Sequence, residues 1–392
     1  MEDYSKLRAY TFVSTSISIF LYGFSVTLGS LLTQISFYPK SMELYLLIEP
    51  PVSLLLGNFL FSYIADKYGR KPVLVITPIL FSIGILLFLL LNPYISLIGI
   101  GLFLFSIAGG DEPAIISYLT ENLSANDRGK FIMLITNFVN IGALLSSIIF
   151  IFFENYTIIK LTITFILILS LTSSYFFRKK LPESKVWVLS NSKNISFINE
   201  NHKRILPLIL ISISTILTYG LISWVIGPYY YPNLTYYIVF LFNLGNIAGG
   251  LLGYFIISKI KRTSFTLFGF FGGSLTSLIL LLIVHSFNNY ILFLSLILTN
   301  GIFTQLTWGT RLVLEGELLR TKYRATGISV VRASGWIIYI FSAIFTYSFS
   351  IAFFQIYDIL FWIIGLLGSA LWHTYGFDTN NLQIIKLDEI NL

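Results

Sequence analysis

Two adjacent acids stand inside a long apolar segment, in a Gly-Gly-Asp-Glu-Pro run at residues 109–113. A charged residue at the centre of a membrane helix costs about 2.5–3.5 kcal/mol on insertion scales, so such residues usually have a function. Asp111 precedes Glu121 by ten residues, which places it roughly 15 Å from the end of the helix. Neighbouring acids in a low-dielectric environment disfavour each other's ionisation, so one could exchange a proton. We therefore interpret Asp111 and Glu112 as proton-coupling residues, only one of which faces the centre squarely.

Two arginines lie inside other apolar segments. Arg311 comes six residues before Glu317, about 9 Å from the helix end, and Arg332 comes eight residues after Arg324, about 12 Å from it. A guanidinium group binds a carboxylate or a phosphate through two parallel hydrogen bonds, so both arginines are expected to contact an anionic substrate. The alternative for Arg311 is an ion pair with Glu315 one turn away, which would only close a gate.

Weaker candidates share these apolar segments. Asn137 and Asn140 lie on one helix face and are predicted to bond a substrate, with helix–helix hydrogen bonding as the alternative. Trp308 and Trp336 are predicted to stack on a substrate ring, and the default alternative is that they only pack within the apolar helices. Asp358 is expected to have a structural role.

The elements that must position these residues are membrane helices. The chain has 392 residues, of which 56% are hydrophobic and 11% charged, and a soluble fold cannot hide so much apolar surface. Apolar runs of 18 or more residues indicate spanning helices. We expect twelve, at 9–35, 41–65, 72–92, 95–120, 129–153, 157–177, 205–228, 233–257, 264–286, 289–316, 325–349 and 352–374.

The distribution of charge predicts the orientation. Of the 25 lysines and arginines, 21 fall at the chain ends or on alternate loops. The positive-inside rule then places both termini in the cytoplasm. The net charge of +7 favours contact with anionic lipids, and its dispersal over separate loops argues against nucleic-acid binding. The sequence has no cysteine, which excludes disulfides, and we expect no metal and no cofactor.

The charged clusters repeat at half the length of the chain. Glu121 is followed by Arg128, and Glu317 by Arg324, with an offset of 196 residues for both members (317 − 121 and 324 − 128). The charged cluster at 66–71 likewise has a counterpart at 258–262 in the second half of the sequence. Parallel repeats of this kind are one known plan for secondary transporters. They predict two six-helix bundles, at 1–177 and 205–374, a linker at 178–204 and a tail at 375–392.

Four loop motifs resemble those of the major facilitator superfamily. The stretch 62–72, Ser-Tyr-Ile-Ala-Asp-Lys-Tyr-Gly-Arg-Lys-Pro, resembles the loop between helices 2 and 3, with Ser62 where Gly is usual. Residues 181–187 resemble the Pro-Glu-Ser signature of the sugar-porter branch. The segments 121–129 and 317–324 resemble its paired loop signatures, with Arg320 in place of Pro. The resemblance implies an all-α, twelve-helix carrier that works by alternating access.

The motif residues are predicted to close the cytoplasmic side. Carboxylates and guanidinium groups at neighbouring helix ends can form charge-assisted hydrogen bonds. We treat these pairs as exposed, worth about 0–1 kcal/mol each, and thus as a bias between two conformations. The predicted gate consists of Asp66, Arg70, Glu121, Arg128, Glu317 and Arg324.

The chain is therefore interpreted as a transporter of the cell membrane and not an enzyme. We expect it to move an organic acid or an inorganic oxyanion with protons, as a monomer among membrane lipids. The run around Asp111 resembles helix 4 of phosphate–proton symporters, but Trp336 stands where phosphate carriers have Lys, and residues 9–39 contain no acid. A sugar or polyol carrier and a non-transporting membrane sensor are the alternatives.

Overall fold

The computed structural model describes residues 2–190, 202–283 and 290–389, and the described part contains helices and turns but no strand. The predicted linker is described at 178–190 and 202–204, and the rest of it lies outside the described residues. So do residues 284–286 and 289, at the ends of two predicted spans, and the last three residues of the predicted tail.

The first half of the chain forms six membrane-crossing rods. Three of these segments are interrupted and consist of two consecutive helices. The helices are α1 (Glu2–Val26) with α2 (Leu28–Leu32), α3 (Glu43–Tyr68), α4 (Arg70–Leu89), α5 (Pro93–Phe103) with α6 (Glu112–Asn122), α7 (Ala125–Thr136) with α8 (Phe138–Phe152), and α9 (Tyr156–Arg178).

The second half repeats this plan after a short helix in the linker. The helices are α10 (Lys185–Ser190), α11 (His202–Gly220) with α12 (Ile226–Tyr230), α13 (Thr235–Ile256), α14 (Arg262–Ile283), α15 (Tyr290–Leu318), α16 (Arg324–Phe345), α17 (Ile351–Tyr375) and α18 (Ile384–Glu389).

Eleven helical segments of the described residues are long and apolar enough to cross a membrane. The remaining predicted span, 95–120, is also helical throughout. A π-helical turn, η2 (Leu104–Asp111), joins α5 to α6 there. Pro113 has no backbone N–H and cannot continue the regular bonding pattern, and wider turns of this kind often mark functional sites. The twelve-helix, all-α prediction is confirmed.

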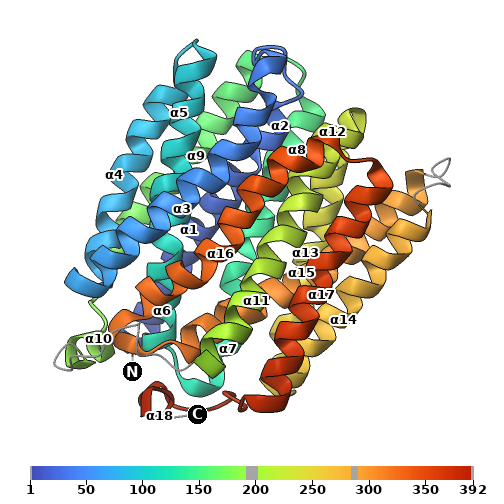
Figure 1. Cartoon of the computed structure of the whole chain (residues 1–392). Helices are drawn as coiled ribbons and strands as arrows, with labels where there is room; N and C mark the ends of the chain where they lie inside the picture. The colour runs from blue at the N-terminus through green and yellow to red at the C-terminus, as the bar shows by residue number, and fades with distance from the viewer. Residues whose placement is uncertain (1, 191–201, 284–289, 390–392) are drawn as a thin grey trace.

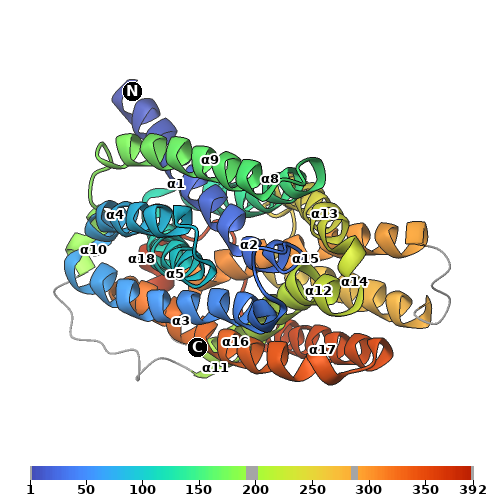
Figure 2. The same cartoon turned by 90° about the horizontal axis from the view of Figure 1, so that it is seen from above.

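The helices of the two halves form two groups that meet along a seam (Figures 1 and 2). Across the seam, α3 packs against α16, α8 against α13, and α7 against α15. Both ends of the chain, α10 and α18 lie at one end of the molecule (Figure 1), which we call the terminal side. The other end is the opposite side.

Apolar side chains cover the outside of the bundle, and charged side chains lie within it. Leu86, Phe165 and Leu282 are 65%, 67% and 71% exposed, as expected of side chains in contact with lipid. By contrast, eight arginines are among the largest fully buried side chains: Arg70, Arg128, Arg178, Arg204, Arg262, Arg311, Arg324 and Arg332. Such buried charges need partners or a function.

Candidate functional site

A buried charge cluster crosses the seam between the halves. Arg332 of α16 donates through Nη1 to Glu112 Oε2 of α6, at 2.6 Å. Its Nε and Nη2 donate to Glu315 Oε2 of α15, at 3.0 and 2.7 Å. The three side chains are at most 3% exposed. Arg332 therefore joins an acid of the first half to an acid of the second.

Arg311 has the least satisfied charge in this cluster. Its guanidinium carbon lies 4.1 Å from the centre of the Trp308 ring, a cation–π contact. Its Nε is 3.4 Å from Glu315 Oε1, but Nε and Nη1 form no hydrogen bond. The ion pair with Glu315 foreseen as the alternative thus exists only loosely, because Glu315 bonds mainly to Arg332. A buried guanidinium with free N–H groups can bind an anion.

Aromatic side chains surround the charges. Trp224, in the π-helical turn η4 (Leu221–Val225) between α11 and α12, is nearly parallel to Trp336 of α16, with centroids 6.3 Å apart and planes at 13°. Tyr339 meets Trp224 edge-on, and Tyr22 of α1 lies within electrostatic range of Glu112. These rings form apolar walls around a charged centre.

Many buried polar atoms around this centre have no hydrogen-bond partner. Buried polar groups are usually paired, so a group of unpaired ones marks a place where a ligand or water binds. The unpaired atoms are Glu112 Oε1, Asn140 Oδ1, Trp224 Nε1, Gln305 Nε2, Trp308 Nε1, Arg311 Nε and Nη1, Glu315 Oε1, Trp336 Nε1 and Tyr339 Oη.

The two asparagines of the sequence prediction lie at the same seam. Asn140 donates to Asn137 Oδ1 at 2.9 Å and to Gln305 Oε1 of α15 at 2.8 Å. Asn137 donates to the carbonyl of Ile247 in α13 at 3.0 Å. Both therefore bond across the halves, as the helix–helix alternative foresaw, while Asn140 keeps one oxygen free.

Asp111 points away from this cluster, into the first half. It accepts hydrogen bonds from Thr77 of α4 and from Arg178, the last residue of α9. Arg178 also donates to Ser18 of α1 and to the carbonyl of Leu74. The two adjacent acids therefore diverge, as neighbours on a helix must: Asp111 bonds within its own half, and Glu112 bonds across the seam.

The predicted gate residues all meet at the terminal side, and each half contains the same arrangement. Arg70 is the first residue of α4 and donates to Glu121 Oε1 at 2.8 Å. Arg262 is the first residue of α14, and its Nε lies 3.5 Å from Glu317 Oε2. Each arginine also donates to the carbonyl five residues earlier in the chain. This correspondence supports the internal repeat seen in the sequence.

The same two acids bond across the seam. Arg128 donates to Glu317 Oε1 through Nε and Nη2, at 2.9 and 2.8 Å. Arg324 donates to Glu121 Oε1 at 2.7 Å. These side chains are at most 1% exposed, so the expectation of exposed, weak pairs is wrong. We call the six predicted gate residues together with Arg262 the terminal-side network.

Asp66 extends the network to a helix N-terminus. Its two oxygens accept from the backbone N–H groups of Ala325 and Thr326, at 3.3 and 2.7 Å, in the first turn of α16. A carboxylate is stabilising there because the first N–H groups of a helix lack partners. Deeper along the same seam, Ser329 Oγ donates a hydrogen bond to Ser62 Oγ at 2.5 Å. The two halves are thus in direct contact at the terminal side.

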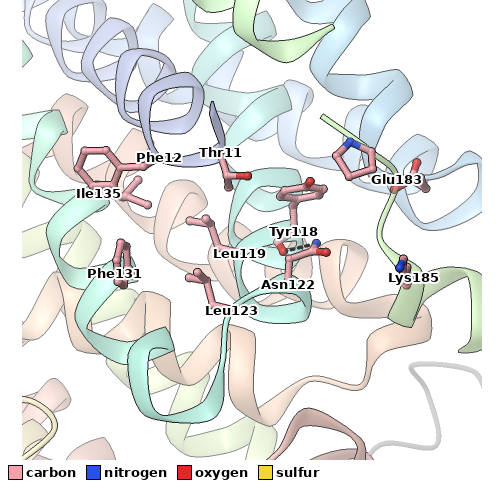
Figure 3. A pocket seen from close by; sticks show the side chains of 11 residues that line it. Thr11, Phe12, Tyr118, Leu119, Asn122, Leu123, Phe131, Ile135, Glu183 and Lys185 are labelled. Carbon is pink, nitrogen blue, oxygen red and sulfur yellow. Dashed lines mark hydrogen bonds between the residues drawn. The ribbon is translucent and has the colours of Figure 1, made fainter. Parts of the chain in front are cut away.

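A cavity of about 210 Å³ also opens at the terminal side, between α1, α6, α7 and the segment before α10 (Figure 3). Phe12, Leu119 and Phe131 form apolar walls, and Glu183 and Lys185 lie at one edge (Figure 3). It contains none of the residues predicted to bind substrate or protons. Arg311, Arg332 and Glu112 lie together at the seam, whereas Asp111 points into the first half.

Sequence reasoning missed several members of the site. Arg178 was assigned to the linker, whereas it is the buried last residue of α9. Trp224 and Tyr339 gave no signal because an aromatic residue in an apolar run is indistinguishable from packing. Gln305 could have been found as an uncharged polar residue six positions before Arg311 in the same apolar segment.

Comparison with known proteins gives consistent results. The family model described as Major Facilitator Superfamily matches residues 9–343. A putative niacin/nicotinamide transporter of Bacillus subtilis (strain 168) is 28% identical over 313 residues, which are 71% of this chain and 72% of that protein.

Solved structures share the fold at low identity. A proton:xylose symporter bound to 6-bromo-6-deoxy-D-glucose superposes with a TM-score of 0.77 at 17% identity, over 98% of this chain and 99% of the other. The xylose transporter from E. coli, in a partially occluded inward-open conformation, gives a TM-score of 0.71 at 17% identity, over 96% and 99% of the two chains.

Proposed function

The chain belongs to the major facilitator superfamily and is a multi-pass transporter of the cell membrane, and from this premise we propose that it carries a small organic anion together with protons. The observation that carries the proposal is the incompletely paired guanidinium of Arg311, which has only a loose ion pair with Glu315. It is buried, it lies on Trp308, and two of its nitrogens have no hydrogen-bond partner. A carboxylate placed against it would gain charge-assisted hydrogen bonds.

The aromatic walls favour an anion that also has a flat ring. Trp308 and Trp336 can contact the faces of such a ring, while Arg311 binds the carboxylate. Niacin, which appears in the name of the Bacillus subtilis relative, is an aromatic carboxylic acid and has both features.

Proton coupling is assigned to Glu112, with Asp111 as the second predicted residue. Protonation of Glu112 would remove the charge that holds Arg332 across the seam. Arg332 would then bond Glu315 alone, and the two halves would be freer to separate. A proton would in this way loosen the same seam that the substrate occupies.

We assign the terminal-side network to the cytoplasmic gate. Its bonds between Arg128 and Glu317, and between Arg324 and Glu121, join the two halves. They must break before the terminal side opens, so the described conformation is closed on that side. In alternating access, the protein would then change between this closed state and a state that is open to the cytoplasm.

The test is uptake of labelled niacin into proteoliposomes with and without an inward proton gradient. Arg311→Gln should raise the niacin concentration that gives half-maximal uptake by about 10–100-fold, since one hydrogen bond to a charged group contributes about 1.5–3 kcal/mol. Lys259→Gln removes an exposed cation and should leave uptake unchanged. Glu112→Gln should abolish stimulation by the gradient. Full uptake in both site variants would refute the assignment.

A sugar or polyol is the second candidate substrate. The free amide atoms of Asn140 and Gln305 and the free indole N–H groups suit neutral hydroxyl groups. A thermal-shift screen of the detergent-solubilised protein against carboxylates, phosphate and sugars separates the two candidates. Stabilisation by sugars alone would favour the second.

A further inference from the structure

Asp358 is a buried acid that the site described above does not use. It lies on α17 in the second half, is 0% exposed, and accepts a hydrogen bond from Ser277 of α14 at 2.8 Å through Oδ2. Its other oxygen, Oδ1, has no hydrogen-bond partner among the described residues, although the indole N–H of Trp362, one turn further along α17, lies near the carboxyl group. Among the described residues, no lysine, arginine or histidine forms an ion pair with it.

Among the described residues, the side chains around Asp358 have hydroxyl, amide and indole groups but no positive charge. Four helices meet near it: α11, α14, α15 and α17. The charged residues of the first three lie toward their terminal-side ends, at Arg204, Arg262, and Arg311 to Glu317. On α17 itself, His373 is fifteen residues further on, and the hydroxyl of Tyr357 is instead 2.8 Å from Ser342 of α16.

A buried acid of the first half, Asp111, has a different environment. Asp111 is equally buried, but Arg178 bonds to it directly and balances its charge. An isolated carboxylate without such a partner is very unfavourable in a low-dielectric interior, and a group in that position becomes neutral instead. The contrast indicates that the charge of Asp358 is neutralised by a proton, whereas the charge of Asp111 is balanced by Arg178.

The hydrogen bonds around Asp358 have a defined direction. Asn300 of α15 donates through Nδ2 to Ser277 Oγ at 3.2 Å and to Thr276 Oγ1 at 3.0 Å. Ser277 Oγ thus accepts from Asn300 and donates to Asp358 Oδ2. That oxygen is therefore the acceptor, and a proton on this carboxyl group belongs on Oδ1.

A bound metal cation fits this arrangement poorly. Asn300 Nδ2 directs its hydrogens at the two hydroxyl oxygens that a cation would need as ligands. Its own Oδ1 is 3.3 Å from the hydroxyl of Thr304, which holds the amide in this orientation. A proton needs none of these oxygens, since Oδ1 is free.

The position of the cluster favours exchange with the opposite side of the membrane. Asp358 is the eighth residue of α17, about 11 Å from the end of the helix on that side, and is seventeen residues from the other end. Gln355, one turn nearer the opposite side, is fully buried and has neither side-chain atom paired. Unpaired buried amide atoms mark a place for water, and water beside Gln355 would lie between Asp358 and the opposite side.

From this geometry we propose that Asp358 is a second proton-binding site of the carrier, located in the second half and separate from the charge cluster at the seam. Its role in transport rests on the proposed coupling to protons, whereas its occupancy by a proton can be measured without any substrate. The proton resides on Oδ1 while Ser277 holds Oδ2.

Infrared difference spectroscopy of the purified protein in lipid films tests the occupancy. The wild-type protein should show the C=O stretching band of a protonated carboxyl group at neutral pH, and the band should weaken reversibly as the pH rises. Asp358→Asn should remove that band, while Glu154→Gln, which changes an exposed acid on the opposite side, should keep it. Ser277→Ala, a milder change, should keep the band and shift its frequency because Oδ2 loses its donor.

Three results would overturn the proposal. If Asp358→Asn removes no band, the carboxyl group of Asp358 is ionised. If Asp358→Asn does not fold, a band that keeps its frequency in Ser277→Ala would likewise show that Asp358 is ionised. A band that stays constant over the whole pH range would make Asp358 a permanently neutral structural group. Thermal stabilisation by sodium chloride but not by choline chloride, lost in Asp358→Asn, would assign a sodium ion to the cluster instead.

Discussion

Replacement of Glu317 by glutamine should open the terminal side. Glu317 accepts two hydrogen bonds from Arg128 across the seam, lies 3.5 Å from Arg262 within its own half, and accepts a further bond from Thr379. A glutamine keeps the shape of the side chain but removes the charge that balances two buried arginines.

The size of the effect follows from burial. The Arg128 and Glu317 side chains are 1% and 0% exposed, and removal of one partner from a buried ion pair costs about 3–5 kcal/mol. Arg128 regains water when the halves separate, so the cost applies to the closed state and not to the open one. A shift of about 3 kcal/mol changes the ratio of the two states on the order of 100-fold.

The assay uses the absence of cysteine from the sequence. A single cysteine introduced at Ser329, which is buried at the seam, reports whether a maleimide can reach that position. Its alkylation rate should rise by about 10–100-fold when Glu317→Gln is added. Glu389→Gln, which changes an exposed acid on α18, is the matched control and should have no effect. An unchanged rate in the folded Glu317 variant would refute the reasoning.

Three further predictions concern other parts of the structure. Asp111→Asn leaves the buried Arg178 without its acid and should lower the thermal unfolding midpoint measurably, whereas an unchanged midpoint would show that the ion pair is not needed. Gly69→Ala should destabilise the protein by about 1 kcal/mol or more, as measured by thermal unfolding in detergent, because Gly69 has φ 110° and an added Cβ would meet Glu183 Oε2. Trp336→Ala should weaken the affinity for an aromatic carboxylate more than for acetate in a binding titration, and equal losses would contradict ring stacking.

The six predicted gate residues meet at the terminal side, as their repetition in the sequence indicated, and their role as a gate stays a prediction. An acid and an arginine seven positions apart recur 196 residues later, and such recurrence places both pairs at equivalent helix ends. The structure pairs Arg128 with Glu317 and Arg324 with Glu121. The burial of these pairs was not predicted, because the packing of the two halves against each other excludes water there.

The sequence indicated only some residues of the central cluster, and their roles in substrate and proton binding stay predictions. Arg311, Arg332 and Glu112 lie together, as their depths within the helices suggested. Spacing along one helix gives depth and direction, but it does not say which neighbouring helix a side chain meets. The partner of Asp111 was missed for this reason, since Arg178 stands at the end of another helix and seemed to belong to a loop.

The sequence by itself determined the membrane environment, the number of helices, the two halves and the charged ends of the helices. These follow from the length of the apolar runs and from repetition, both of which are properties of the chain read in one dimension. Only the tertiary structure decided that Arg332 joins Glu112 to Glu315, that Arg311 keeps free N–H groups, and that no cation of the described residues lies beside Asp358. Those outcomes depend on which helices pack against each other, because a buried charge is balanced by whatever group the neighbouring helix presents to it.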